Sequence, residues 1–109
     1  MDQNENMAQF ILIHQEGFSS ALKINSLHRM RLNLNSKPMP DILAIKNGQQ
    51  YIVEAKFWNT NNRIPTISNN PKDIDFIIIT TSDNRYAILP PLKYFNGNNY
   101  NVAWRYIVS

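Results

Sequence analysis

Residues 40–57 read PDILAIKNGQQYIVEAKF, two apolar runs joined by Asn47-Gly48. Asn-Gly between apolar runs is the strongest short-range signal for a β-hairpin, because a type I′ turn needs positive φ at both central residues. We therefore predict strands at residues 42–46 and 49–57. In a two-residue turn Lys46 pairs with Gln49, and counting outward along both strands sets Asp41 opposite Glu54, with Cβ atoms about 5 Å apart.

The hairpin gathers charged side chains on one face. Lys56 lies two residues beyond Glu54, so alternation along the strand puts both on the same face as Asp41. Two carboxylates directly opposite each other repel unless something offsets their charge. A divalent cation with oxygen ligands would do so, and Mg²⁺ is commonly held by one or two carboxylates with waters and phosphates. The alternative is that these are solvated hairpin residues, with Lys56 neutralising one acid.

Before the hairpin, residues 4–16 are predicted to form a short helix. An apolar stripe follows the i, i+3, i+4, i+7 spacing at Met7, Phe10, Ile11 and His14. Gly17 suits the position just after a helix, where a left-handed conformation is common. Residues 27–34 alternate imperfectly and predict a strand.

After the hairpin, residues 58–73 are rich in Asn, Pro, Thr and Ser and are predicted to be a long loop, with room for one helical turn. So long a loop inside one domain indicates a functional loop or a missed element. Strands are expected at residues 75–81, 86–89 and about 100–108, with a short helix from Pro90-Pro91 through Phe95. The order of elements favours an α/β or α+β sheet with few helices, in a single domain spanning residues 1–109.

Composition narrows the function. The net charge of +3 and the pI near 9.3 suit a polyanionic partner, though only weakly. The chain has no cysteine, which excludes disulfides and cysteine-based zinc sites and favours an intracellular, cytoplasmic location. Residues 1–6 are polar and acidic, unlike a signal peptide. No apolar run approaches the roughly 20 residues that cross a bilayer, so a membrane partner is not expected.

Three stretches carry a resemblance to a known family. Pro40-Asp41, then twelve residues, then Glu54-Ala55-Lys56 resembles the signature of the PD-(D/E)XK nuclease superfamily. Residues 5–18, a Glu followed by Gly-Phe, resemble the opening helix of archaeal Holliday junction resolvases. Residues 73–79 and 86–90 are similar to the core of intron-encoded PD-(D/E)XK endonucleases. Two features depart from the pattern: only Ser36 could stand for a Ser-rich loop, and the 58–73 loop replaces an expected helix.

The resemblance implies a restriction-endonuclease-like fold, a central mixed β-sheet flanked by helices, and phosphodiester hydrolysis with Mg²⁺, for which Mn²⁺ could substitute. Asp41 and Glu54 would ligate the metal with the carbonyl of Ala55. Lys56 would position or deprotonate the attacking water and stabilise the developing charge. Glu5 would assist from the helix, with Glu16 as the competing candidate.

Basic and aromatic side chains could bind DNA around this site. The candidates for phosphate contacts are Arg29, Arg31, Lys37, Arg63 and Lys72. Such contacts would position a backbone without reading sequence, and ordinary solubilising charge is an equal alternative for any one of them. Trp58 could stack on an unpaired base, although core or interface packing is the commoner role.

The function indicated first is therefore a Mg²⁺-dependent DNA endonuclease acting on Holliday junctions or other branched DNA, with a homodimer to serve two strands. Two alternatives stay open. One is a sequence-specific homing or restriction-type endonuclease. The other is a catalytically inert DNA-binding module on the same fold.

Overall fold

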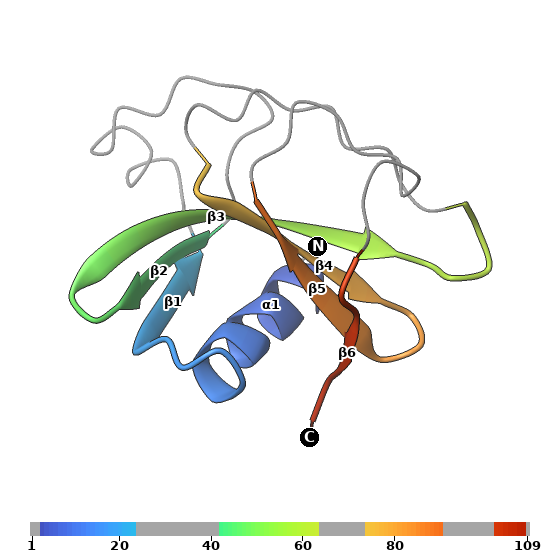
Figure 1. The fold of residues 1–109 in the computed structure, drawn as a ribbon, viewed down its shortest axis with the longest axis horizontal. Coiled ribbons are helices and arrows are strands. Elements are labelled where there is room, and N and C mark those ends of the chain that lie inside the picture. Colours follow the sequence, from blue (N-terminus) through green and yellow to red (C-terminus); the bar gives the residue numbers. More distant parts are fainter. Residues whose placement is uncertain (1–2, 24–41, 64–73, 91–101, 109) are drawn as a thin grey trace.

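The computed structural model describes residues 3–23, 42–63, 74–90 and 102–108. There the chain forms a six-stranded sheet in the order β1-β2-β3-β4-β5-β6, with a helix against one face (Figure 1). The elements are α1 (Gln3–His14), β1 (Ser20–Lys23), β2 (Ile42–Lys46), β3 (Gln49–Trp58), β4 (Phe76–Thr81), β5 (Arg85–Leu89) and β6 (Arg105–Tyr106). The sheet is mixed, because β3 and β4 are parallel and the other neighbours are antiparallel. The α+β class is confirmed at this level.

The β2–β3 hairpin has the predicted register. Lys46 pairs with Gln49 and Ile42 with Val53. Asn47 has φ 53° and Gly48 has φ 76°, the two positive values that a type I′ turn requires. Strand β3 runs to Trp58, one residue further than expected.

Strand β1 was not predicted from the sequence. It pairs antiparallel with β2, and Ala21 lies opposite Ala44. The Ser19 N–H extends the pairing by donating to the Ile45 carbonyl at 2.8 Å. Four residues, SALK, are too few to show a period of two, so β1 is recognisable only through its partner strand. The strand expected at residues 27–34 lies outside the described residues.

The long connection after β3 has a topological reason. Strands β3 and β4 are parallel, with Glu54 beside Ile77, and a parallel pair needs a crossover of a dozen or more residues. The described beginning of that connection includes a turn in which the Asn62 N–H donates to the Asn59 carbonyl at 2.9 Å. Residues 64–73 of the expected loop lie outside the described residues.

The second half of the sheet agrees with the expected strands, with one correction. Strands β4 and β5 are antiparallel, with Ile78 opposite Ile88. The last strand is shorter than expected, since only Arg105–Tyr106 pair with β5 while residues 102–104 and 107–108 are irregular. Residues 91–95, where a short helix was expected, lie outside the described residues.

Helix α1 is present, but the predicted stripe was wrong in part. Ala8, Ile11 and Leu12 are fully buried, whereas Met7 is 39% and Phe10 36% exposed. The predicted His14 is also exposed, with its ring 4.5 Å from that of Phe10. Apolar side chains occupy most sides of this helix, so residue spacing alone is compatible with either of two buried stripes. The stripe that contains Ala8 is the buried one, because its small side chain allows the helix to lie closer to the sheet. The helix ends at His14, two residues earlier than expected. Gly17 follows with φ 78°, the left-handed conformation predicted for it, and the Phe18 N–H donates to the Leu12 carbonyl at 2.9 Å.

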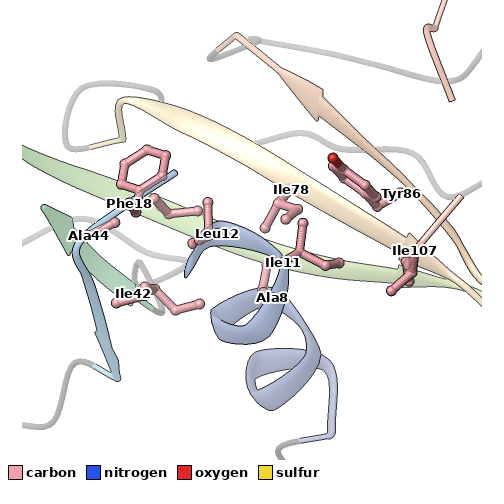
Figure 2. Close-up of a cluster of buried hydrophobic side chains, with 12 residues drawn as sticks. Ala8, Ile11, Leu12, Phe18, Ile42, Ala44, Ile78, Tyr86 and Ile107 are labelled. Carbon is pink, nitrogen blue, oxygen red and sulfur yellow. The ribbon is translucent and has the colours of Figure 1, made fainter. Parts of the chain in front are cut away.

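The sheet has apolar side chains on both faces. On the α1 face, the helix packs on residues that include Ile42, Ala44, Val53, Ala55 and Ile78 (Figure 2). The opposite face, which we call the Glu54 face, carries a second cluster formed by Ile74, Ile77, Ile79 and Leu89, with Trp58, Val102 and Trp104 packed against it. No helix among the described residues is long and apolar enough to span a membrane.

Candidate functional site

Alternation along β3 separates the site residues from the core under the helix. Val53 and Ala55 belong to the cluster on the α1 face. Glu54 and Lys56 alternate with them and therefore point to the other face of the sheet. In the parallel register Glu54 lies beside Ile77 and Lys56 beside Ile79. Two charged side chains thus stand in a row next to buried isoleucines.

Glu54 is a buried acid with a cationic partner. It is 1% exposed, although a glutamate is almost never fully buried unless it is paired. Its Oε2 lies 2.9 Å from Nζ of Lys56, whose side chain is 35% exposed. Because the Glu54 carboxylate is shielded from water, the attraction between these charges is stronger than the same pair would have in water. The structure therefore brings together two of the three residues predicted for the catalytic patch.

The third residue, Asp41, lies outside the described residues. Strand β2 begins one residue later, at Ile42, which is opposite Val53. This is the register on which the predicted pairing of Asp41 with Glu54 depends, and that pairing stays a prediction. Ala55 turns its side chain toward α1, and the assignment of its carbonyl as a metal ligand also stays a prediction.

The two candidate helix acids lie on the α1 face. Glu5 is carried by the first turn of α1, so the described contacts do not join it to the Glu54–Lys56 pair on the other face. Glu16 accepts a hydrogen bond from the Tyr86 hydroxyl at 2.5 Å and lies 3.5 Å from the Arg105 guanidinium. Burial, followed by the bond to Glu16, raises the pKa of Tyr86. Glu16 therefore has a packing role at the end of the helix.

The predicted phosphate contacts fall mostly outside the described residues: Arg29, Arg31, Lys37 and Lys72. Arg63 is described and is exposed, in the segment that follows β3. Its side chain is available to solvent, while its role toward DNA stays a prediction.

Sequence reasoning missed a cationic group on the Glu54 face. Arg85 begins β5, and its guanidinium carbon lies 5.5 Å from the centre of the Trp104 ring. Asp83 holds this guanidinium through contacts of 2.9 and 3.0 Å from Nε. Hydrogen bonds from Arg85 and then Thr81 lower the pKa of Asp83. The Asp-x-Arg spacing across the turn was the available signal.

The metal site predicted from the sequence stays a prediction. None of their His, Asp and Glu side chains form a group of three or more that could hold an ion. In such a site Glu54 would contribute a carboxylate oxygen and Ala55 its carbonyl oxygen. These hard oxygen donors fit Mg²⁺, which needs few protein ligands because it retains waters and binds substrate phosphates.

Comparisons with known proteins leave the family open. No family model matches the chain, and no solved structure matches it significantly. Among curated proteins, atrial natriuretic peptide receptor 2 of Anguilla japonica is 28% identical over 58 residues, covering 53% of this chain. The matched stretch is 6% of the receptor's length. So short and weak a match shows neither a family nor a function.

Proposed function

We propose that this chain is a Mg²⁺-dependent DNA endonuclease of the PD-(D/E)XK type, acting through Glu54, Lys56 and Asp41. The observation that carries the proposal is the buried Glu54 carboxylate with the Lys56 ammonium at 2.9 Å. The hairpin register adds support, because extending it by one pair would set Asp41 opposite Glu54. A second acid at that position would make the patch electrostatically unfavourable without a cation.

Each residue has a separate role in the proposed reaction. Asp41 and Glu54, with the carbonyl of Ala55, would hold the ion, and Mn²⁺ could replace Mg²⁺. When bound, the ion supplies Lewis acidity at the phosphoryl oxygen and lowers the pKa of a bound water. Lys56, as the ammonium, would orient the attacking water, and its charge would stabilise the phosphorane. To take the proton of that water, Lys56 would first have to release a proton of its own. Glu5, which belongs to the α1 face, would assist only from a distance.

The mixed sheet is the kind of sheet that the family resemblance implies, which supports a restriction-endonuclease-like fold. The net charge of +3 is compatible with DNA as the partner. A homodimer would place two such sites against two strands, as cleavage of branched DNA requires. Holliday junctions or related branched DNA are therefore the substrates we propose.

The test is cleavage of linear and four-way-junction DNA in Mg²⁺, in Mn²⁺ and in EDTA. Asp41→Asn and Glu54→Gln should each abolish cleavage. Glu16→Gln, which removes a carboxylate from the α1 face and can still accept the Tyr86 hydroxyl, should not. Calorimetric titration with Mn²⁺ gives a readout independent of turnover, and Glu54→Gln should weaken that binding.

Three other outcomes of this test would contradict the proposed mechanism or favour another function. Full activity in EDTA would contradict the metal mechanism. Cleavage of linear DNA at one defined sequence would favour the homing or restriction-type enzyme. Tight DNA binding without cleavage under any condition would favour the inert DNA-binding module.

A further inference from the structure

The two tryptophans of the chain lie together on the Glu54 face. Trp58 is the last residue of β3, and Trp104 directly precedes β6. Their ring centroids are 5.6 Å apart, with the ring planes inclined by 40°. Both pack against the cluster around Ile77 and Ile79, and both keep part of their surface exposed. Each tryptophan is therefore partly packed on this cluster and partly exposed to solvent.

A hydrogen bond holds the Trp58 ring in place. The Trp58 indole N–H donates to the Asn62 carbonyl at 3.1 Å. The turn that carries Asn62 is braced in its own right, since the Thr60 N–H donates to the Ser82 hydroxyl at 2.9 Å. Rings fixed in advance lose little conformational entropy when a flat ligand stacks on them.

One guanidinium, that of Arg85 in its ion pair with Asp83, lies next to the rings. The Arg85 guanidinium lies 5.5 Å from the centre of the Trp104 ring, in a position fixed by Asp83. The exposed Arg63 ends the described segment that follows Trp58. Aromatic rings beside a guanidinium suit a ligand that combines a planar base with a phosphate.

The tryptophan pair lies next to the candidate site on the same face of the sheet. Trp58 lies two residues after Lys56 in the same strand, so the side chains share a face and are separated by about 7 Å along it. Glu54, Lys56 and Trp58 therefore follow one another along β3. This spacing is close enough for one nucleotide to contact the ion pair and its neighbour to contact the rings.

We propose that Trp58 and Trp104 form a stacking platform for an unpaired base of the DNA strand whose phosphate lies at Glu54 and Lys56. The inference rests on the proposed function and narrows its substrate class to DNA with an unpaired nucleotide, such as a branch, flap or single strand. In a continuous duplex both faces of each base are covered by its neighbours, so a stack on tryptophan requires a base that has left the helix.

Intrinsic fluorescence tests this directly, because both tryptophans of the chain are in the platform. The wild-type chain, in Ca²⁺ without Mg²⁺, is titrated with an oligothymidylate of about 15 nucleotides and with a blunt hairpin duplex. Tryptophan emission should be quenched by the oligothymidylate and much less by the duplex. Equal quenching by both, or binding without any change in emission, would overturn the proposal.

Two variants connect the signal to the residues. Trp58→Leu should weaken oligothymidylate binding about tenfold, in the range for loss of one base–aromatic stack. Phe10→Leu is the matched control, since Phe10 is an exposed aromatic residue on α1, and it should bind like the wild type. Should Trp58→Leu fail to fold, the wild-type titration still decides.

The platform and the nuclease can fail separately. Preferential quenching by the oligothymidylate without cleavage of any DNA would retain the platform and remove the enzyme. Metal-dependent cleavage of duplex and branched DNA at equal rates, unchanged in Trp58→Leu, would retain the enzyme and remove the platform.

Discussion

The carboxylate of Glu54 lies 2.9 Å from the ammonium of Lys56, yet the two side chains are unequally buried. The Glu54 side chain is 2% exposed and the Lys56 side chain 35%. Water can therefore compensate the charge of Lys56 if its partner is removed, but can do so much less for Glu54. This asymmetry determines which half of the ion pair the fold can lose.

Lys56→Met should destabilise the chain more than Glu54→Gln. Lys56→Met takes the ammonium away from a buried carboxylate and should cost about 2 kcal/mol of unfolding free energy. Glu54→Gln keeps the shape of the side chain and leaves a cation that water reaches, so about 1 kcal/mol is expected. Urea unfolding of both variants measures the difference. The reverse order would show that contacts of Glu54 other than its pair with Lys56 dominate its contribution.

Substitution of Lys56 should change the reaction rate, whereas substitution of Arg29 or Arg31 should change the DNA affinity. Lys56→Ala should slow cleavage greatly and leave affinity in Ca²⁺ nearly unchanged, because a group used in the transition state contributes little to ground-state binding. Arg29→Ala and Arg31→Ala should weaken binding to all sequences and reduce the salt slope by about one unit each, since a phosphate contact releases counterions. A Lys56→Ala protein that binds poorly but cleaves normally once bound would contradict the assignment.

The β2–β3 turn should accept glycine at position 47 but lose stability with alanine at position 48. Gly48 has φ 76°, and a Cβ there would meet nothing within 4 Å, so Gly48→Ala is penalised by backbone strain alone. We expect a loss of about 1 kcal/mol in unfolding free energy. Asn47→Gly, at φ 53°, is the matched control and should change stability by a few tenths at most. Thermal unfolding of the two variants compares them, and equal melting temperatures would argue against a type I′ turn.

Tyr86 should make the fold sensitive to alkali. Burial and the hydrogen bond to Glu16 raise the pKa of Tyr86 above its ordinary value of 10.0. Since the folded chain holds this proton more tightly than the unfolded chain, the stabilisation is complete below pH 10.0 and is lost as the pH rises through the folded pKa. Urea unfolding between neutral pH and pH 11 should show this loss. Tyr86→Phe should be less stable at neutral pH and should show a smaller decline.

Local sequence determined the parts of this protein that depend on neighbouring residues. Asn47-Gly48 supports positive φ at both turn positions, so the register of β2 and β3, and the shared face of Glu54 and Lys56, were predictable. The left-handed conformation of Gly17 after the helix was predictable for the same reason. These features arise from backbone sterics and side-chain alternation, which need no distant partner.

Tertiary structure decided the features that depend on what lies opposite. Helix α1 is apolar on most sides, and only packing on the sheet selects Ala8, Ile11 and Leu12 in preference to Met7, Phe10 and His14. Strand β1 exists because β2 offers it an edge, and the parallel pairing of β3 with β4 joins segments that are distant in sequence. The burial of Glu54 and the meeting of Trp58 with Trp104 follow from that pairing. Burial and long-range contacts each require two segments that are distant in sequence, so neither segment alone predicts them.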